Sequence, residues 1–293
     1  MIKWSVLSKS ILVLLVLGSA LSISLCAQHD DSSETVEVWL TTGDEANKLK
    51  QQNDKSFTSE EEINHPFILI KENIKYQTME GFGAAMTDSS AWLLNELKAN
   101  NSTKYWEVMK VLFNKTEGIG ISYIRLPMGA SDFARYNYTY DEMPSGQVDP
   151  NLANFSIDRD KDYIISVLKD AIAINPQIKF MASPWSAPAW MKLNKELNNG
   201  SLNPEYRKAY ANYFVNFTQA YQDEGIPISL VTVQNEPQNP TPEYPSMKME
   251  WYDQSDFIIN YLEDFDLLVE RARFGPQIQL SASYLPRSRA ISS

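Results

Sequence analysis

The chain has 293 residues, 43% of them hydrophobic, which is enough to fill the core of one large α/β domain or of two average ones. Its formal net charge of −11 argues against nucleic acid or an anionic membrane surface as a partner, because both would repel it. Histidine and cysteine are too scarce for a Ser–His–Asp triad, a His-ligated metal site or a zinc–thiolate site, since the sequence holds only His29, His65 and Cys26. We therefore expect no metal and no cofactor, and hydrolytic chemistry would have to come from carboxylates, tyrosines or lysines.

The N-terminus has the features of a targeting segment. Basic residues precede an apolar run that ends at Leu25, and the small residues Cys26 and Ala27 separate this run from a polar stretch. This order predicts a signal peptide over residues 1–27 and a protein that is secreted or extracellular, periplasmic or lysosomal according to its source. The alternatives are an N-terminal membrane anchor and a lipid-modified Cys26; Leu25 disfavours the second, because a small residue is expected at its position. No other stretch is long and apolar enough to span a bilayer, so no stable membrane span is expected after cleavage.

Residues 28–75 form the next predicted segment. Alternation of apolar and polar residues over 35–40 predicts a strand, and residues 67–71 form a second short β-like run. The polar stretch 41–62 between them is compatible with a helix or a loop.

From about residue 79 the pattern changes to an alternation of strands and helices. Strands are predicted at 79–83, 121–127, 178–184, 228–233 and 278–284. Helices are predicted at 91–97, 104–113, 160–174, 204–225 and 255–273. Such alternation predicts a parallel sheet, either open and doubly wound or closed into a (β/α)₈ barrel. A full barrel needs eight strands, so the five candidates leave two possibilities, an open five-stranded sheet or a truncated barrel.

Polar and aromatic residues stand just past the ends of four of these strands. Asp88 follows the first strand, Arg125 lies in the second, Trp185 follows the third, and Asn235 and Glu236 follow the fourth. In a barrel all these ends converge on the face where active sites form. In an open parallel sheet they would also lie along one edge, so convergence alone does not prove a barrel.

Each of the first three residues has a structural alternative. Asp88 can be only the N-cap of the following helix. Arg125 is expected to point inward, where it must pair with a carboxylate, either as the electrostatic support of a catalytic glutamate or as a structural ion pair. Trp185 and its neighbour Trp190 can fill core space, although the prolines around them indicate a loop, and an aromatic side chain on a loop is a good platform for the C–H face of a sugar.

Glu236 is the sharpest candidate for chemistry. It follows a strand directly and precedes Pro237, which predicts a carboxyl held at the strand's end by a rigid turn. A buried carboxyl there would have a raised pKa, which suits a general acid near neutral pH. Asn235 beside it is placed to hold a substrate hydroxyl. The alternative is an ordinary turn carboxylate.

Four motifs in this order and spacing resemble glycoside hydrolase family 30, the family of the glucosylceramidases and the endo-β-1,6-glucanases. They are Gln-Thr-Met-Glu-Gly-Phe-Gly through Thr-Asp at 77–88, Tyr-Ile-Arg-Leu-Pro-Met at 123–128, Ala-Ser-Pro-Trp-Ser-Ala-Pro at 182–188 and Val-Thr-Val-Gln-Asn-Glu-Pro at 231–237. The similarity extends from about Thr35 to Tyr284.

The resemblance implies a fold and a set of roles. The fold would be a (β/α)₈ TIM barrel, with residues 28–75 contributing to an accessory β-sandwich and residues 76–293 forming an incomplete barrel. Glu236 matches the family's general acid/base. Asp88, Trp185 and Asn235 match positions that contact the sugar, and Arg125 matches an arginine close to the catalytic carboxylates. The substrate would be a β-glucoside, in a glycolipid or in β-1,6-glucan.

The sequence departs from the family in its second half. The resemblance implies a retaining mechanism with a second glutamate at the end of the seventh strand, and none of the carboxylates after Glu236 occupies a later strand end. We therefore expect that the nucleophile is missing from this chain and that the chain is truncated, through a fragmentary or frameshifted gene model rather than as a real product. The predicted function is that of a retaining, glucosylceramidase-like β-glycosidase. A secreted non-catalytic carbohydrate-binding protein or an inactive fragment is the alternative, and the oligomeric state is left open.

Overall fold

The computed structural model describes residues 35–57, 68–262 and 279–280. The chain divides into two compact units, residues 1–76 and 77–293. The predicted signal peptide and most of the helix predicted at 255–273 lie outside the described residues. Among the helices that are described, none is both long and apolar enough to cross a membrane.

The described residues of the first unit form short antiparallel strand pairs. They are β1 (Thr35–Val36) with β4 (Lys55–Ser56), and β2 (Trp39–Leu40) with β3 (Lys50–Gln51). The predicted strand at 35–40 is therefore two strands. Their partners come from the polar stretch 41–62, for which the sequence was compatible with a helix or a loop. The β-like run at 68–71 forms no strand; its apolar side chains are exposed, Ile68 by 91%, because no neighbouring strand in the described part of the chain pairs with it. Its part in an accessory β-sandwich stays a prediction.

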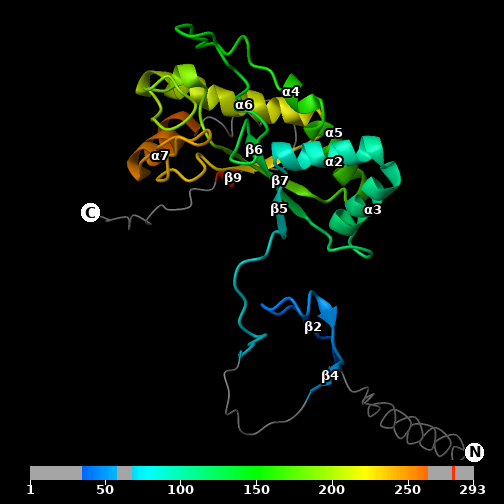
Figure 1. Ribbon diagram of the computed structural model, residues 1–293. Coiled ribbons are helices and arrows are strands. Elements are labelled where there is room, and N and C mark those ends of the chain that lie inside the picture. The colour runs from blue at the N-terminus through cyan, green and yellow to red at the C-terminus, as the bar shows by residue number, and fades with distance from the viewer. Residues whose placement is uncertain (1–34, 58–67, 263–278, 281–293) are drawn as a thin grey trace, which may run out of the picture. The chain divides into compact units, whose positions relative to one another are not determined.

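The second unit is built on a parallel sheet in which the strands follow one another in chain order (Figure 1). The strands are β5 (Gly83–Ala85), β6 (Tyr123–Met128), β7 (Lys179–Pro184), β8 (Ile228–Val231) and β9 (Gln279–Leu280). Every neighbouring pair is parallel. A doubly wound sheet reverses its strand order at a switch point, whereas an unbroken order is that of a (β/α)₈ barrel.

β5 begins four residues later than the strand predicted at 79–83. Its pairing with β6 starts at Gly83, which lies opposite Tyr123. A Cβ at Gly83 would lie 1.5 Å from the carbonyl oxygen of Tyr123, so only glycine allows the two backbones to approach this closely. The close approach sets the register of the two strands, in which Ala85 lies opposite Arg125 and Asp88 follows three residues later.

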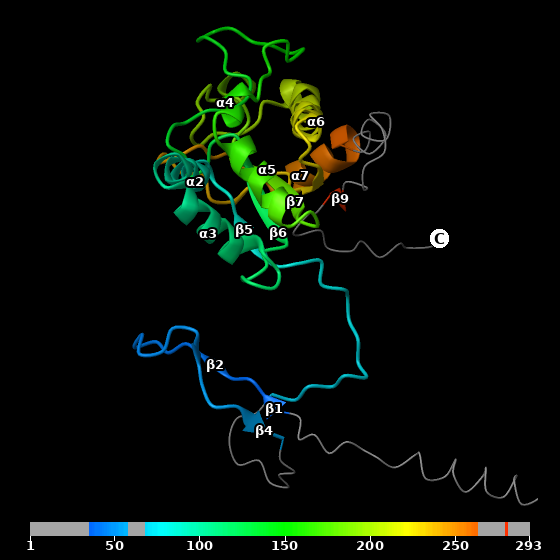
Figure 2. The same ribbon diagram turned by 90° about the vertical axis from the view of Figure 1, so that its right-hand side faces the viewer.

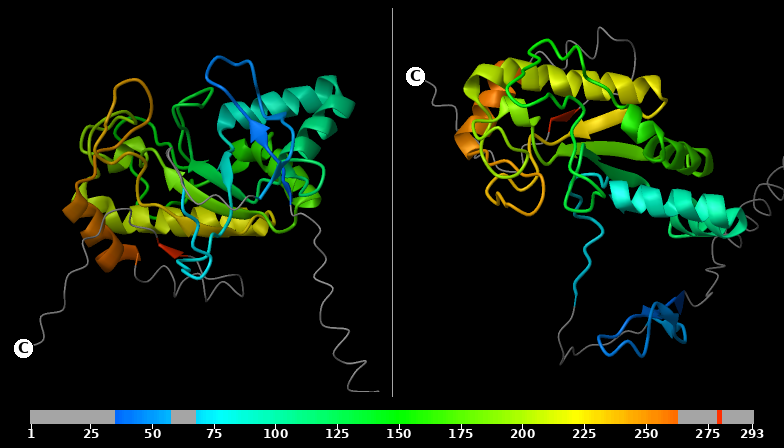
Figure 3. Two further views of the ribbon diagram at one scale, coloured as in Figure 1. Left: turned by 90° about the horizontal axis from the view of Figure 1, so that it is seen from below. Right: turned by 45° about the horizontal axis from the view of Figure 1, so that its top comes forward.

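Helices connect the strands and follow them in order, as Figure 2 shows from α3 past α5 to α6 and α7. The described helices are α2 (Asp88–Asn100), α3 (Ser102–Phe113), α4 (Asp158–Lys161), α5 (Ile164–Ile174), the 3₁₀ turns η1 (Ala189–Met191) and η2 (Pro204–Tyr206), α6 (Arg207–Asp223), α7 (Trp251–Phe257) and the π-helical turn η3 (Ile258–Leu262). α5 packs against α2 and α3, and α6 packs against β8 (Figure 3). The core therefore lies between the sheet and this helical layer.

Local sequence sets the helix boundaries. Thr87 caps α2 by accepting a hydrogen bond from the Ser90 backbone N–H at 3.3 Å. Proline at position 204 opens η2, and the segment that continues into α6 terminates at Gly225, whose φ of 81° favours glycine. These are the boundaries that the pattern at 204–225 predicts.

A buried carboxylate ties α6 to the loop that follows β6. Asp160 is fully buried, and its side chain accepts hydrogen bonds from the hydroxyls of Tyr138 at 3.2 Å, Tyr140 at 2.7 Å and Tyr221 at 2.6 Å. Burial raises the pKa of Asp160 to about 6, although the three tyrosine hydrogen bonds act in the opposite direction. This network, the Asp160 cluster, adds polar contacts between the loop after β6 and α6 to the aromatic packing of Tyr140 against Tyr213 and Phe217.

Candidate active site

The end of β7 places an indole beneath an arginine of β6. Trp185 directly follows β7 and is 5% exposed. The guanidinium carbon of Arg125 lies 4.5 Å from the centre of a Trp185 ring, a cation–π contact between neighbouring strands. Gln234, which the sequence did not single out, donates from Nε2 to the Trp185 carbonyl at 2.6 Å and holds the loop from the other side.

Arg125 also binds the residue next to Glu236. Its Nη2 donates to Asn235 Oδ1 at 2.7 Å, and the Asn235 backbone N–H donates to the Pro184 carbonyl at 2.8 Å. The ends of β6, β7 and the segment after β8 are thereby joined by one arginine, one amide and one indole. The structure thus brings together Arg125, Trp185 and Asn235, as expected for neighbouring strand ends.

The prediction that Arg125 pairs with a carboxylate is wrong. No carboxylate in the described part of the chain lies within ion-pair distance of its guanidinium, and its partners are an amide oxygen and an aromatic face. Burial lowers the pKa of Arg125, while the charges of Asp132 and Glu236 act in the opposite direction from farther away. Because its close partners are neutral, its positive charge is not cancelled locally and acts on Glu236 through space.

Glu236 lies in a turn, as the sequence predicts, but its carboxyl is not buried. The side chain is exposed, and Oε2 accepts a hydrogen bond from Asn239 Nδ2 at 3.1 Å. Its backbone has a φ of 42°, in the left-handed region, and its carbonyl accepts from the Asn239 N–H at 2.9 Å. The expectation of a buried carboxyl is wrong: the chain stays hydrogen-bonded to β7 as far as Asn235, and the turn at Glu236 then directs this side chain to the surface. A non-glycine residue at positive φ costs about 1–3 kcal/mol, and such strain is concentrated at functional sites.

Asp88 lies past the end of β5, and both of its carboxylate oxygens accept hydrogen bonds from other residues of the protein. It is buried; Oδ1 accepts from the Arg135 backbone N–H at 2.7 Å and Oδ2 accepts from the Tyr163 hydroxyl. The helix cap is Thr87, so the interpretation of Asp88 as an N-cap is wrong. Among the described hydrogen bonds none joins Asp88 to Arg125 or Asn235.

Trp190 is a core residue rather than an open sugar platform. It is buried and donates from Nε1 to Asp141, to the carbonyl at 3.1 Å and to Oδ2 at 3.0 Å. Its ring packs edge-on against Tyr206 at 4.9 Å. The indole N–H is hydrogen-bonded and the ring is packed within the protein, so neither is available to a ligand.

Two further residues near Glu236 went unnoticed in the sequence. Burial, followed by the charges of Glu236 and Asp132, raises the pKa of Tyr244, which places this phenol in the electrostatic surroundings of Glu236. Asp132 acts on both Tyr244 and Arg125. Both residues lie in loops, where no periodicity marks them, so only the folded chain reveals them. Within the described residues no group of His, Cys, Asp and Glu side chains is arranged to hold a metal ion.

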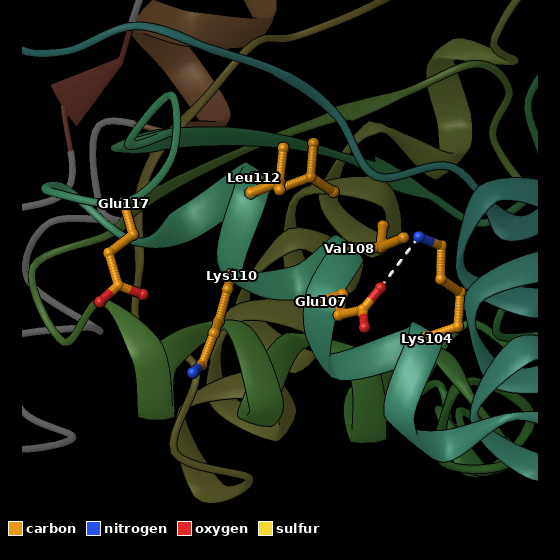
Figure 4. A pocket seen from close by; sticks show the side chains of 7 residues that line it. Lys104, Glu107, Val108, Lys110, Leu112 and Glu117 are labelled. Atoms are coloured by element: carbon orange, nitrogen blue, oxygen red, sulfur yellow. Dashed lines mark hydrogen bonds and ion pairs between the residues drawn. The ribbon is translucent and has the colours of Figure 1, made fainter.

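The described surface includes hollows in two different places. One of about 520 Å³ lies on the strand-end loops and is lined by Asn137, Glu142, Ala189, Asn194, Glu196, Leu197, Asn198, Asn199 and Pro242. The other, of about 460 Å³, is lined only by residues of α3 and the turn after it (Figure 4). In it Lys104 and Glu107 form an ion pair at 2.9 Å across one helical turn. The second hollow contains none of the strand-end residues, and we assign it no role.

Comparison with known proteins decides the family. The model of the glycosyl hydrolase family 30 TIM-barrel domain matches residues 79–265. The chain belongs to this family. The predicted TIM-barrel type of fold, with about five strand–helix units present, is confirmed.

Its relatives include two kinds of family 30 enzyme. An endo-1,6-β-D-glucanase of Trichoderma harzianum is 35% identical over 199 residues, 64% of this chain and 40% of the relative. The lysosomal acid glucosylceramidase of Mus musculus is 36% identical over 170 residues, 56% of this chain and 32% of the relative. The chain thus spans about 40% or less of the length of these relatives.

Solved structures agree on the fold. An endo-β-1,6-glucanase superimposes with a TM-score of 0.66 at 35% identity, covering 82% of this chain and 50% of the other. The protein SrfJ of Salmonella typhimurium has a TM-score of 0.70 at 23% identity, covering 82% of this chain and 52% of the other, which shows the fold alone.

Proposed function

We propose that this family 30 protein is a secreted, retaining β-glycosidase with Glu236 as its general acid/base. The observation that carries the proposal is the junction of three strand ends, where Arg125 binds Asn235 and stacks on Trp185 beside Glu236. This edge of a (β/α)₈ fold is where active sites form. The leader-like sequence over residues 1–27 supports secretion.

Each residue has a defined part in the proposed reaction. Glu236 protonates the glycosidic oxygen as the bond breaks and later takes a proton from water; its exposed carboxyl is accessible for both steps. Arg125 supplies an uncancelled positive charge nearby, and Asn235 and Trp185 contact the sugar. Asp88 contacts it through the carboxylate lone pairs that its bonds to Arg135 and Tyr163 leave free. Retention also needs a second carboxylate about 5–5.5 Å from the acid/base, and we assign no residue of this chain to that step.

The proposed substrate is β-linked glucose in either of two settings. The relatives named as endo-1,6-β-glucanases and those named as glucosylceramidases match this chain at similar identity, so both β-1,6-glucan and glucosylceramide are candidates. Both present a β-glucosyl unit to the same site. Comparison of hydrolysis rates on the two substrates decides between them.

The variant Glu236→Gln tests the acid/base role in the protein as its organism produces it. Loss of the acid should lower turnover of substrates with poor leaving groups by about 10²–10⁴-fold, while aryl β-glucosides with good leaving groups lose much less in the bond-breaking step. Glu243→Gln, an exposed glutamate in the same loop, is the matched control and should act like the unaltered protein. A near-normal rate of Glu236→Gln on poor leaving groups would refute the assignment.

The competing function is carbohydrate binding without turnover. It predicts that the unaltered protein binds β-glucan and hydrolyses neither the glucan nor an aryl β-glucoside. Both functions place the sugar against the same strand-end residues, so hydrolysis of an aryl β-glucoside decides between them.

A further inference from the structure

Lys192 is a fully buried lysine with no acidic partner at contact distance. Its relative exposure is 0%, although lysine is almost never fully buried unless it is paired. No carboxylate in the described part of the chain forms a salt bridge with it. The charge must therefore be stabilised in another way, or the burial would be strongly unfavourable.

The Lys192 side chain instead donates to three neutral oxygen atoms. Nζ lies 2.9 Å from Ser186 Oγ, 2.6 Å from the Leu197 carbonyl and 2.8 Å from the Ser246 carbonyl. An ammonium group has three donors and no acceptor, so the three oxygens use its full capacity. The geometry matches the charged form of the side chain.

The three acceptors belong to the two loops that form the candidate active site. Ser186 follows Trp185 after β7, and Leu197 lies farther along the same loop, whereas Ser246 lies in the loop that begins with Glu236. The Ser246 backbone N–H donates to the Leu197 carbonyl at 3.1 Å. Lys192 thus sits where the β7 loop and the β8 loop cross.

The same crossing continues through other hydrogen bonds. The Asn199 N–H and the Thr241 N–H both donate to Ser246 Oγ, at 3.0 Å and 2.9 Å. The Lys248 N–H donates to the Gly200 carbonyl at 2.8 Å. The bonds of Asn199 and Lys248 cross between the two loops and depend on their register, whereas the bond of Thr241 orders the β8 loop itself. Among the described residues Lys192 is the one charged group whose side chain bonds to both loops here.

We propose that the Lys192 ammonium is a positioning residue, which locks the loop of Glu236 onto the loop of Trp185 and so sets the geometry of the site. The proposal rests on the glycosidase function proposed above. Lys192 acts through the loops and does not touch the reacting atoms.

The lock depends on protonation. A neutral amine offers only two donors and a lone pair, so one of the three oxygens would lose its partner and face that lone pair. Burial lowers the pKa of Lys192 to about 7, while the charges of Glu196 on its own loop and Glu142 on the β6 loop act in the opposite direction. The locked state is therefore populated below a pH of about 7 and is lost above it.

As pH rises through about 7, the contribution of Lys192 to the free energy of unfolding should increase while the population of the locked state decreases. The folded pKa of Lys192 lies below the ordinary value of 10.5 in the unfolded chain, so the unfolded state binds more protons between these values. Stability rises with pH wherever the unfolded state binds more protons. This group therefore adds to stability as pH rises above about 7, while the site loses its geometry. If Lys192 had a purely structural role, stability and activity would change in the same direction with pH.

The first test compares pH profiles of unaltered protein, Lys192→Met and Lys208→Met. Lys208 is an exposed lysine of α6 whose side chain forms no hydrogen bond or salt bridge with the described residues, so its variant should follow the unaltered protein. Lys192→Met should lower kcat about 10- to 100-fold at pH below 7 with little change in KM, because misplacement of reacting groups by about 1 Å has an effect of this size. It should also lack the alkaline fall in kcat that begins near pH 7. An unchanged kcat and an unchanged alkaline limb would overturn the proposal.

The second test needs no catalysis. Amide hydrogen exchange at Ser246 and Lys248 should be about tenfold faster in Lys192→Met, because local opening exposes these amides, while amides within α6 keep their rates. In the unaltered protein the protection factors of the same two amides, corrected for intrinsic exchange, should fall as pH rises through about 7, so the test stands even if the variant fails to fold. Unchanged protection in both experiments contradicts the lock. If the unaltered protein hydrolyses no β-glucoside, the glycosidase proposal fails, and exchange alone then decides whether Lys192 locks the loops.

Discussion

Asp160 and Glu236, two carboxylates of the second unit, differ in burial and in how many hydrogen bonds they accept. Asp160 is fully buried and accepts three tyrosine hydroxyls, so its hydrogen-bonding capacity is used for structure. Glu236 is exposed, sits at a strained φ of 42° and accepts one described side-chain hydrogen bond, from Asn239. A carboxylate with occupied oxygens holds loops together, whereas one that reaches solvent at a strand end is available for proton transfer. Asp88 resembles Asp160 in this respect, since the protein already occupies both of its oxygens.

The largest expected effect is on turnover and belongs to Glu236. Glu236→Gln should lose about 10²–10⁴ in rate on poor leaving groups and change the free energy of unfolding by no more than about 0.5 kcal/mol, because the side chain is exposed. Kinetic assays and urea denaturation of the same preparation measure both quantities. A large loss of stability in Glu236→Gln would contradict the claim that Glu236, unlike Asp160, contributes little to stability.

Asp160→Ala should show the converse pattern. Three tyrosine hydroxyls would lose their acceptor in the core, which should lower the free energy of unfolding by about 3–5 kcal/mol. Urea denaturation measures the loss. Lys208→Met serves as the control for a substitution on the exposed face of α6, and an Asp160→Ala protein as stable as this control would show that the cluster does not hold the β6 loop.

The pH dependence of stability sharpens the role of Asp160. Its folded pKa of about 6 lies above the ordinary 3.8, so the folded state binds more protons than the unfolded state between these values. Its contribution to stability is therefore fully present below about pH 3.8 and is lost as pH rises through about 6, a change of roughly 2–3 kcal/mol. The difference in unfolding free energy between the unaltered protein and Asp160→Asn, measured from pH 4 to 7, isolates this group from the other carboxylates. A difference that does not vary with pH contradicts the assignment.

The smallest effect concerns Arg125. Arg125→Met removes the bond to Asn235 and the charge near Glu236, and should lower kcat/KM about 10- to 100-fold. Arg125→Lys should restore little of the loss, because an ammonium cannot stack on Trp185 and reach Asn235 in the same planar geometry. Full rescue by lysine would mean that charge alone matters at this position.

Much of the fold was predictable because it follows from local chemistry. The strands at 121–127 and 178–184 and the helix at 204–225 have strong periodicity and clear boundaries, and the structure places β6, β7 and α6 within a few residues of them. The short strands of the first unit were missed or merged because two-residue strands have too few residues for a pattern. The strand predicted at 79–83 was displaced because the start of β5 depends on the close approach of Gly83 to Tyr123, a contact between distant parts of the chain.

The candidate site divides along the same line. The amino-acid sequence by itself determined which residues stand at strand ends, since alternation, prolines and the four motifs are local properties; Arg125, Trp185, Asn235 and Glu236 were all found in this way. Only the tertiary structure decided their partners. It gave Arg125 an amide and an indole in place of a carboxylate, left Glu236 exposed, and joined the two loops through the ammonium of Lys192. Burial and hydrogen bonding depend on segments that are far apart in sequence, and no local pattern contains that information.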